Sequence, residues 1–452
     1  MRTDCNKTKT DFTPLARRAV AAQFDAGAIS SDGGMVLLRE VDRRINLLGR
    51  VSDLIRDPRN PVLIEHDQRT MLAQRVLAIA CGHEDLNDHD TLRNDLVLQL
   101  ASDRKASSRK KGQGDVDPDR PLASAPTLHR LENRVDRQAC VEINKLLVEL
   151  YIESHKASPP KEIILDFDST DDLVHGNQEG RFFHGYYGNY CYLPLYVFAG
   201  DQLLCAYLRP SNIDDAKHSW AILALITRRL REVWPEVKII FRADSGFCRW
   251  RTLRWCDRHG VDYIVGFAKN SRLIAMSKPL MDEAEGKFKQ TGEKQRIIGD
   301  LLYAAGTWDH PRRVIARIEH TNKGENPRYV VTSLEGDAQM LYECVYCARG
   351  EMENRIKEQQ LGLFADRTSC KRFIANQFRL LLSSLAYVLV ETLRRTHLAG
   401  TELAKAQAGT IRLKLLKIGA LVQTSVRRIV IHLSGAFPLQ ELFASLATQL
   451  SG

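Results

Sequence analysis

Apolar residues follow a helical spacing through the first third of the chain. Between residues 14 and 150 they recur at intervals of three and four, most clearly in 36–41, 69–80 and 140–152. This spacing places apolar side chains on one face of a helix. We therefore predict that the region is mostly helical.

The pattern changes at residue 162, where short apolar runs replace the helical spacing. Runs of this length, bounded by turn residues, predict strands. In order, the sequence predicts strands at 162–167, 189–198 and 203–208, a helix at 214–234, a strand at 237–242, a helix at 250–259 and a strand at 261–267. The order β-β-β-α-β-α-β predicts the fold class, an α/β protein with a mixed sheet.

The last part of the chain alternates between strand-like and helical patterns. Residues 270–342 contain two runs that alternate like the strands of a hairpin, which predicts a β-rich insertion. A helical pattern returns from 345 to about 398. The tail at 410–434 contains two segments, 411–415 and 426–431, that alternate apolar with basic or polar residues, so we expect a basic β-ribbon there.

The charge balance suggests a class of partner. The 452 residues carry 65 lysines and arginines against 56 aspartates and glutamates, a formal net charge of +9 with a pI near 9.0. This balance fits a polyanion such as nucleic acid, although an ordinary solvated surface has a similar composition. Residues 101–124 concentrate basic side chains among serine, glycine and proline, so they read either as a phosphate-binding loop or as a solvated linker.

Secreted and membrane proteins find little support in the sequence. The N-terminus lacks the apolar segment of a secretory signal, and the longest apolar run is interrupted by two serines and too short to span a bilayer. We expect a cytoplasmic protein with reduced thiols and no membrane partner. Cys344 and Cys347 form a C-x-x-C without a second pair, and Cys81, His83 and His89 are an incomplete ligand set, which favours core thiols over structural zinc.

Acidic residues gather at the ends of two predicted strands. The motif DFDSTDD, residues 166–172, follows the first strand, and Asp244 follows the strand at 237–242. If these strands are neighbours, Asp168 and Asp244 meet at one edge of the sheet, where open α/β sheets usually hold their sites. Asp166 shares the strand face of Asp168 and is the second choice as a ligand. The remaining acids of the motif read as turn or helix-cap residues.

A third acid comes from the helical pattern after residue 345. Tyr346, Arg349, Glu353 and Lys357 lie three and four residues apart, so they share one face of a helix. A ladder of salt bridges is the ordinary explanation for such a face. The alternative is that Glu353 joins the two strand-end acids in a site.

Converging carboxylates have a clear chemical use. They hold two Mg²⁺ or Mn²⁺ ions about 3.5–4 Å apart, and the metal charge offsets their mutual repulsion. One ion activates water or a 3′-hydroxyl, and the other stabilises the leaving oxygen during attack at phosphorus. We predict Asp168, Asp244 and Glu353 as both the catalytic residues and the metal ligands.

The chain resembles the DDE transposases of bacterial insertion sequences, in the IS1380 group that is related to the IS4 type. The matching segments run in order between about residues 160 and 380: LDFDSTDD, FHGYYGNYCYLPLYVFAGDQLLCAYLRPSN, IIFRADSGFCRW, RGEMENRIKE and DRTSCKRFIANQFRLLL. The resemblance implies an RNase H-like core and a cut-and-paste reaction, in which transposon ends are nicked and then joined to target DNA. By position, Asp168, Asp244 and Glu353 match the catalytic triad of the family.

The pattern and the resemblance together divide the chain into five expected regions. They are a helical N-terminal DNA-binding region at 1–155, a first part of the RNase H-like core at 160–269, a β-rich insertion at 270–342, a second part of the core with the catalytic glutamate at 343–400, and a basic C-terminal tail at 401–452. The expected partners are double-stranded DNA, as terminal inverted repeats and target, and further copies of the chain in a homodimer or higher oligomer on the DNA. The expected location is the bacterial cytoplasm, at the nucleoid.

The IS4-type pattern Y-x2-R-x3-E-x6-K is matched except at its last position. Tyr346, Arg349 and Glu353 fit, and Gln360 stands where the lysine is expected. A neutral amide does not bind phosphate as a cation does. Lys357, about one turn earlier, is the candidate substitute, so Tyr346, Arg349 and Lys357 are all predicted to contact DNA.

Other residues have weaker reasons to contact DNA. Arg249 suits a phosphate, Trp308 suits stacking on an unpaired base, and the aromatic run FFHGYY at 182–187 suits a position beside DNA. Their ordinary explanations are a surface salt bridge, core packing and a loop packed on the core. Three cations suit the DNA backbone, with a solvated helix face as the alternative: Arg367, Lys371 and Arg372.

Three rival functions remain at this point. One is a nuclease with the same core that performs no strand transfer. Another is a decayed copy that binds inverted repeats as a repressor. A glycosidase that uses paired acids is disfavoured by the basic charge and the Arg- and Lys-rich helix.

Overall fold

The chain folds into two compact units, the first formed by residues 1–134 and 385–452 and the second by 135–384. The first unit thus joins the two ends of the chain. Most of the basic segment at 101–124 lies outside the described residues. The structure, a computed structural model, describes three stretches of the chain: residues 9–104, 120–425 and 427–451.

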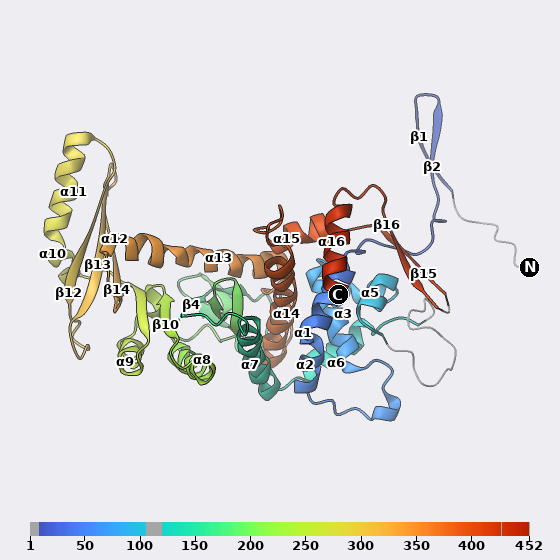
Figure 1. Cartoon of the computed structure of the whole chain (residues 1–452), viewed down its shortest axis with the longest axis horizontal. Helices are drawn as coiled ribbons and strands as arrows, with labels where there is room; N and C mark the ends of the chain where they lie inside the picture. Colours follow the sequence, from blue (N-terminus) through green and yellow to red (C-terminus); the bar gives the residue numbers. More distant parts are fainter. Residues whose placement is uncertain (1–8, 105–119, 426, 452) are drawn as a thin grey trace, which may run out of the picture. The chain divides into compact units, whose positions relative to one another are not determined.

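Helices make up most of the first unit (Figure 1). The central one, α3, is buried along almost its whole length. Asp67 caps its start, because the carboxylate accepts a hydrogen bond of 2.9 Å from the Thr70 N–H. The helical prediction for this part of the chain is largely confirmed by α1 (Met35–Ile45), α2 (Leu47–Leu54), α3 (Gln68–Ala80), α4 (His89–Leu92), α5 (Leu96–Ala101) and α6 (Ala125–Arg134).

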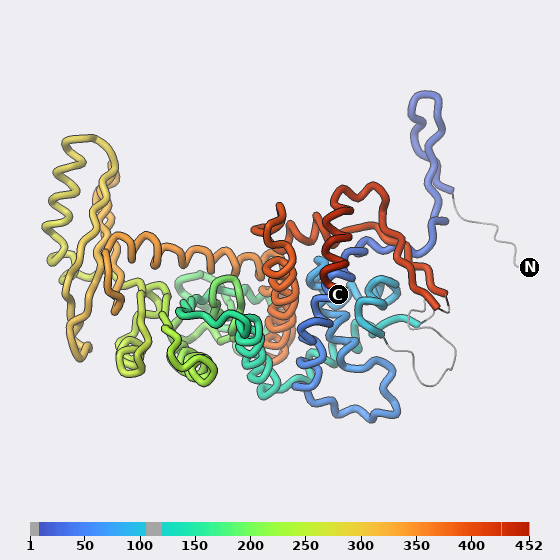
Figure 2. Tube along the Cα trace, in the orientation of Figure 1, coloured from blue at the N-terminus to red at the C-terminus, as the bar shows by residue number. Residues whose placement is uncertain are grey.

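Two small sheets accompany these helices. β1 (Thr10–Leu15) and β2 (Arg18–Ala22) form an exposed hairpin, visible in the trace of Figure 2, where the sequence predicted the start of the helical region. In the tail, β15 (Ala420–Thr424) pairs with β16 (Ile429–Leu433), and β3 (Ile29–Ser30) pairs with β15. The strand expected at 426–431 is therefore present in part as β16, but it pairs with β15 and not with 411–415.

The other predicted strand of the tail, at 411–415, is wrong. This segment is helical, in α15 (Ala408–Ile411) and a following π-helical turn. Ile411 and Leu415 are both buried, and their spacing of four suits a helix face as well as it suits a strand. Arg412 Nε donates to the Ala80 carbonyl at 2.8 Å, which satisfies a carbonyl group at the end of α3. The chain then continues to the last helix, α16 (Gln440–Ser451).

A buried polar network holds the helices of the first unit together. His89 Nε2 faces Arg75 Nη1 at 3.2 Å, and Arg75 Nε donates to Glu132 Oε1 at 3.1 Å. Because a guanidinium only donates, His89 Nε2 must accept and the ring is neutral. Burial, reinforced by the charge of Arg75, lowers the pKa of His89 to about 2.

The same contacts argue against a zinc site in this region. His89 faces Arg75, whereas His83 Nε2 bonds to Asp32 Oδ2 at 2.8 Å. Cys81 is buried, and burial raises the pKa of its thiol. The nine cysteines among the described residues are all free, as expected for reduced thiols.

An eight-stranded mixed sheet forms the centre of the second unit. Its strand order is β12-β13-β14-β11-β10-β4-β8-β9, in which β4, β10 and β11 are parallel and the other pairs are antiparallel. The predicted mixed α/β sheet is confirmed. The strands are β4 (Glu162–Ser169), β8 (Leu195–Ala199), β9 (Gln202–Tyr207), β10 (Lys238–Ala243), β11 (Asp262–Phe267), β12 (Gln295–Tyr303), β13 (Arg312–Thr321) and β14 (Gly324–Thr332).

The residues predicted as a β-rich insertion extend this sheet. β14 pairs antiparallel with β11, and β13 and β12 follow outwards. The same segment contributes two helices, α10 (Ser271–Met276) and α11 (Lys278–Thr291), and α11 packs on β12 and β13.

The sheet has two differently covered faces. From β4, the odd-numbered residues Ile163, Leu165 and Phe167 enter an apolar core to which α7 (Arg137–Ser154), α8 (Ser219–Val233) and α9 (Trp250–His259) contribute. The even-numbered residues point to the opposite face, which is covered by a helical run from 338 to 362 that includes α13 (Gly350–Lys357). Figure 1 shows α13 on one side of the sheet and α8 and α9 on the other.

Three predicted boundaries in this unit need correction. The strand expected at 189–198 is divided at Pro194, which has no N–H for a sheet, into β7 (Asn189–Tyr192) and β8. The helix expected from 214 begins at Ser219. The helical pattern from 345 to 398 is interrupted between Gly362 and the start of α14 (Phe373–His397).

Helix α14 is both long and apolar. By length and composition it is able to cross a membrane, but 83% of its most apolar stretch is buried within the protein. It is therefore a core helix, as the sequence predicted.

The buried His89 network generates a prediction about stability and pH. The folded state resists protonation of His89 down to a pKa of about 2, whereas the unfolded chain binds the proton near 6.5. The unfolded state therefore holds more protons between these values, so stability falls as the pH drops below 6.5. We expect a slope from this residue of up to about 1.4 kcal/mol per pH unit.

The measurement is urea unfolding, followed by circular dichroism at 222 nm between pH 7 and pH 4.5. His89→Gln should flatten the slope relative to the parent protein. His129→Gln, a change at an exposed histidine of α6, serves as the control. An unchanged slope in His89→Gln contradicts the neutral-histidine assignment.

Candidate active site

Two parallel strands bring the first two predicted acids to one edge of the sheet. β4 and β10 pair in register, with Asp166 beside Arg242 and Phe167 beside Ala243. The next residues on the two strands are Asp168, at the end of β4, and Asp244, just beyond β10. The predicted adjacency of the two strands is confirmed.

Asp166, the second choice as a ligand, already has a partner. Its Oδ2 accepts a hydrogen bond of 2.7 Å from Arg242 Nη2, and Arg242 also donates to the Val345 carbonyl at 2.5 Å. All three groups lie on the face covered by the helical run. Asp166 therefore helps to anchor this run on the sheet, and Asp168 is the acid left at the strand end.

The helical run carries the predicted third acid over the same face. Its segments, starting at 338, are α12 (Ala338–Met340), a π-helical turn (Leu341–Tyr346), a 3-10 turn (Cys347–Arg349), α13 and a second π-helical turn (Glu358–Gly362). Tyr346 packs against β11 at Gly266. A Cβ atom at Gly266 would lie 2.6 Å from Tyr346 Oη and 2.7 Å from Ser245 N, so only glycine allows this approach.

Arg349 joins the strand acid to the helix acid. Its Nη1 donates to Asp168 Oδ2 at 3.1 Å, and its Nη2 lies 2.7 Å from Glu353 Oε1. The salt-bridge ladder that the sequence offered as an alternative is present in the Arg349–Glu353 pair. Because Arg349 also pairs with Asp168 on the sheet, the salt bridge on the helix and the cluster of acids share the same arginine.

The acids of this cluster outnumber its cations. Asp168 is buried, with 9% of its surface exposed. Burial raises its pKa to about 7, Asp244 and Glu353 add to the rise, and Arg349 opposes it. Burial also raises the pKa of Asp244, against Arg349 and the N–H of Gly246, which donates to Asp244 Oδ1 at 2.8 Å. A further positive charge would therefore be favourable here.

A fourth carboxylate, Asp215, lies beside the cluster and was not predicted. Ser169 Oγ donates to Asp215 Oδ1 at 3.4 Å. A Cβ atom at Gly246 would lie 3.1 Å from Asp244 Oδ1 and 3.4 Å from Asp215 Oδ2, so the two carboxylates flank this glycine. Asp215 also contributes to the raised pKa of Asp244.

A buried arginine fixes the loop that carries Asp215. Arg209 Nε donates to the Leu193 carbonyl at 2.9 Å, and its Nη1 donates to the carbonyls of Asp215 and Lys217 at 2.7 and 2.9 Å. The loop replaces the first turn of the predicted helix. The signal in the sequence was an arginine before the polar run SNIDD, but its partners are main-chain groups, which leave no trace in a sequence pattern.

Comparison with known protein families adds an independent finding. Residues 12–452 match the family described as transposase DDE domain group 1. The chain belongs to this family of DDE transposases. No curated protein matches the chain at a significant level.

Membership confirms the predicted class of activity. A transposase acts on DNA phosphodiesters, and DDE transposases generally use divalent metal ions. Two features of the transposase cluster fit such ions: its hard oxygen donors, and the excess of carboxylates around one guanidinium. Three of its carboxylates are the predicted ligands: Asp168, Asp244 and Glu353.

Among the described residues, one group of side chains has ligand atoms close enough together to hold a metal ion as they stand, and it is not the predicted triad. Ligand atoms of Asp257, Asp309 and His310 lie within 4.8 Å of one another. Arg312 Nη2 lies 2.5 Å from Asp257 Oδ2 and 3.0 Å from Asp309 Oδ1. A cation therefore already occupies this group. In the predicted cluster, Arg349 stands between Asp168 and Glu353 in the same way.

Gln360, where the IS4-type pattern has a lysine, faces inwards. Its Nε2 donates to Asp172 Oδ1 at 3.0 Å and to the Asp171 carbonyl at 3.1 Å. Asp172 is fully buried. Gln360 thus ties the end of the helical run to the turn that follows Asp168. Lys357, the candidate substitute, is exposed on α13.

The weaker DNA-binding candidates of the transposase have varied surroundings. Arg249 forms an ion pair with Asp214. Trp308 stacks on Phe267 at 5.3 Å and lies under the Arg312 guanidinium, so it packs against the core. The last three candidates lie between the helical run and α14, outside any helix: Arg367, Lys371 and Arg372. A solvated helix face, the alternative that the sequence offered for them, therefore does not apply.

The charge balance of the cluster predicts the effect of removing its cation. Arg349→Ala leaves Asp168 buried without its compensating charge, so we expect the free energy of unfolding to fall by about 3 kcal/mol in metal-free buffer. Asp168→Asn in the same chain should restore much of this loss. The measurement is urea unfolding followed by tryptophan fluorescence, because all five tryptophans lie in the second unit.

Arg249→Ala is the matched control for this prediction. It removes an arginine whose partner, Asp214, is exposed, and such pairs contribute at most about 1 kcal/mol. Equal losses for Arg349→Ala and Arg249→Ala would contradict the proposed balance of charges.

Proposed function

We propose that the chain is a cut-and-paste transposase of the IS1380 group, which cleaves DNA at terminal inverted repeats and transfers the freed ends into target DNA. One observation carries the proposal. Arg349 contacts both Asp168 of β4 and Glu353 of α13, and the charge of Asp244, just beyond β10, acts on the same group. The three acids occupy the positions that match the catalytic triad of the family.

The topology supports an RNase H-like core. Taken in chain order, the strands β4, β8, β9, β10 and β11 lie side by side in the order three-two-one-four-five, with the first, fourth and fifth parallel. In this proposal 160–269 and 343–400 form the core, and 270–342 is the insertion. Residues 1–155 bind the transposon ends, and 401–452 form a basic tail.

The proposed cofactor is a pair of Mg²⁺ or Mn²⁺ ions held by Asp168, Asp244 and Glu353. Such ions polarise the scissile phosphate and lower the pKa of bound water. The chain positions the acids: the Ser169 N–H donates to Asp168 Oδ1 at 2.9 Å, and the Gly246 N–H holds Asp244. Arg349 supplies donors for the anionic oxygens of the phosphate.

The proposed reaction has two steps of the same chemistry. Water first attacks phosphorus at the transposon end, breaks the P–O3′ bond and leaves a 3′-hydroxyl and a 5′-phosphate. That 3′-hydroxyl then attacks a target phosphodiester and displaces a target 3′-oxygen, which takes up a proton. Tyr346, Arg349 and Lys357 on the helical run, with Arg249, Arg367, Lys371 and Arg372, are proposed to contact the DNA backbone. Trp308 is proposed only as a support for the core.

The proposed assembly is a homodimer or higher oligomer on double-stranded DNA at the bacterial nucleoid. The basic net charge of +9 supports a DNA partner. A nuclease without strand transfer and a repressor that only binds inverted repeats are the alternatives. Gln360 favours them in one respect, because the family's phosphate-binding lysine is absent.

Metal-dependent cleavage tests the catalytic assignment. A labelled duplex that carries the element's end is incubated with the protein and Mg²⁺, Mn²⁺ or EDTA. We expect Asp168→Asn, Asp244→Asn and Glu353→Gln each to lower cleavage at least about a thousandfold, because each removes a ligand charge at the reacting phosphate. Asp309→Asn, in the competing acidic group, should cleave like the parent protein.

Products joined to a target plasmid would distinguish transposition from simple cleavage. Binding of the end without any cut would favour the repressor. Loss of cleavage in Asp309→Asn, with full activity in Glu353→Gln, would move the metal site away from Arg349 and refute the proposal.

The fourth carboxylate yields a separate prediction. Because Asp215 lies beside Asp244 and adds negative charge there, Asp215→Asn is expected to lower cleavage about 10- to 100-fold, less than a ligand would. The control is Asp214→Asn, a neighbouring change at an exposed acid that pairs with Arg249. Cleavage rates at several Mn²⁺ concentrations give the readout. Equal rates for the two variants would remove Asp215 from the site.

A further inference from the structure

An exposed aromatic hairpin follows the first catalytic strand. It consists of β6 (Phe182–His184) and β7 (Asn189–Tyr192), and β7 also pairs with the short strand β5 (Asp172–Leu173). Phe183 and Tyr190 are opposed across the pair, and their rings meet edge to face at 5.6 Å. We call residues 181–192 the aromatic hairpin.

The tip of the aromatic hairpin is open. Tyr186 is 87% exposed, and a Cβ atom at Gly185 or Gly188 would meet nothing within 4 Å. Phe183 is 57% exposed. Large aromatic side chains left in water at neighbouring positions usually mark a binding surface. The alternative given by the sequence, a loop packed on the core, does not describe these side chains.

Several contacts place the aromatic hairpin beside the candidate active site. β5 begins shortly after Asp168 on the same segment of chain. Ser211 Oγ, in the loop that carries Asp215, donates to the Phe182 carbonyl at 2.9 Å. Tyr187 faces the same acids: burial raises the pKa of its phenol, and the negative charges of Asp171, Asp215 and Asp168 add to the rise.

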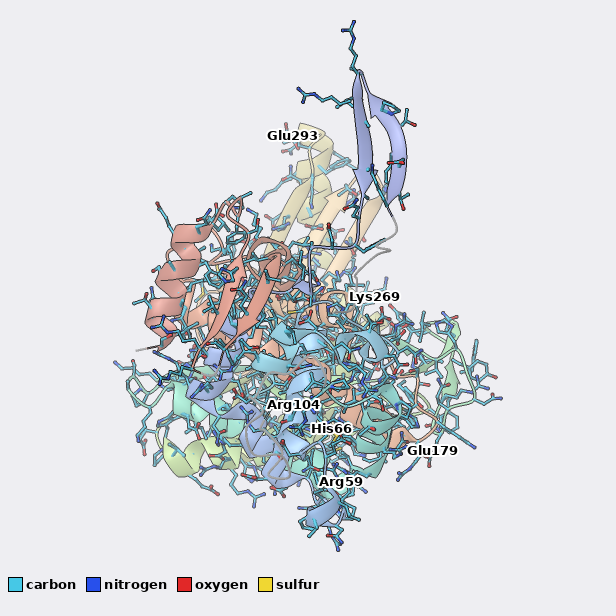
Figure 3. The ribbon with its side chains drawn as sticks, turned by 90° about the vertical axis from the view of Figure 1, so that its right-hand side faces the viewer. Arg59, His66, Arg104, Glu179, Lys269 and Glu293 are labelled. Atoms are coloured by element: carbon cyan, nitrogen blue, oxygen red, sulfur yellow. The ribbon has the colours of Figure 1, made fainter. Side chains whose placement is uncertain are left out.

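Basic side chains accompany the aromatic rings. The Arg181 guanidinium lies 4.7 Å from the centre of the Tyr190 ring. At the base of the hairpin, Glu179 (labelled in Figure 3) accepts the Phe373 N–H at 3.1 Å, and its own N–H donates to the Lys371 carbonyl at 2.9 Å. The segment that carries Lys371 and Arg372 is therefore tied to the start of the hairpin.

This combination fits one class of ligand. Unpaired nucleic-acid bases stack on aromatic rings and on arginine, while nearby cations contact the phosphates. A protein partner or a second copy of the chain would also cover apolar rings. The neighbouring cations and the acids of a DNA-cleaving site favour DNA.

We propose that the aromatic hairpin binds unpaired bases of the DNA strand next to the scissile phosphate, with Tyr186 and Phe183 as stacking platforms. The inference rests on the proposed function for its choice of DNA. It adds a binding surface outside the cluster of acids and assigns it a single-stranded part of the substrate.

A forked DNA of arbitrary sequence tests the inference without relying on recognition of the element's ends. The fork carries 2-aminopurine in its single-stranded arm, and binding is followed by the quenching of its fluorescence in EDTA. We expect the parent protein to quench the arm. We expect Tyr186→Ala to bind the fork about tenfold more weakly, whereas Tyr186→Phe, which keeps the ring, should bind like the parent.

The control is Trp220→Ala, which removes an exposed aromatic side chain from α8 in the same unit. It should leave both quenching and affinity unchanged. With a fully paired duplex, the difference in affinity between Tyr186→Ala and the parent protein should be much smaller than with the fork. Light scattering on the free proteins reports any change in oligomeric state.

Equal affinity of Tyr186→Ala and the parent for the fork would overturn the inference, as would loss of self-association in Tyr186→Ala with normal fork binding. The proposed function fails by another route, namely the absence of metal-dependent cleavage at the element's end. Since the fork assay uses neither metal nor the element's sequence, the two failures are distinguishable.

Discussion

The contact of Arg349 with Asp168 and Glu353 is the interaction on which the site depends. Asp168 is a buried carboxylate whose neighbours are also acids, so without a cation its ionised form would be strongly disfavoured. Arg349 supplies that cation from a helix that lies across the sheet. One side chain therefore balances the charge of the site and links the two parts of the chain that form it.

The geometry of the sheet makes this contact available. Alternation along β4 sends Ile163, Leu165 and Phe167 to the core beneath α7, α8 and α9. It sends Asp166 and Asp168 to the opposite face. The helical run needs a close approach to that face, and Gly266 provides it, because any side chain there would meet Tyr346. The Asp166–Arg242 pair adds a hydrogen bond to the main chain of the run at Val345. On β4, core residues thus alternate with two acids: Asp166, which has a structural role, and Asp168, which is a catalytic candidate.

Local patterns in the sequence were sufficient for part of this arrangement. The strand alternation and the acids at two strand ends predicted the pairing that brings Asp168 and Asp244 together, and the spacing of Arg349 and Glu353 predicted their shared helix face. Asp215 escaped prediction because its position depends on Arg209, whose partners are main-chain carbonyls, and such contacts leave no trace in a sequence pattern. The prediction of a strand at 411–415 was wrong because a tertiary contact decides the structure of this segment. Its alternation suited a strand, but its contact with α3 stabilises a helix.

Gln360, which stands where the IS4-type pattern has a lysine, has a structural role in this chain. Its amide is the hydrogen-bond partner of Asp172, a fully buried carboxyl group whose pKa burial raises well above its usual range. The Gln360 amide donates to one of its buried oxygens without adding a charge. A lysine in this orientation would need either an ionised Asp172 or a route to solvent, and burying an ion pair there would cost desolvation of both charges. At this position the buried surroundings therefore favour the amide over a lysine.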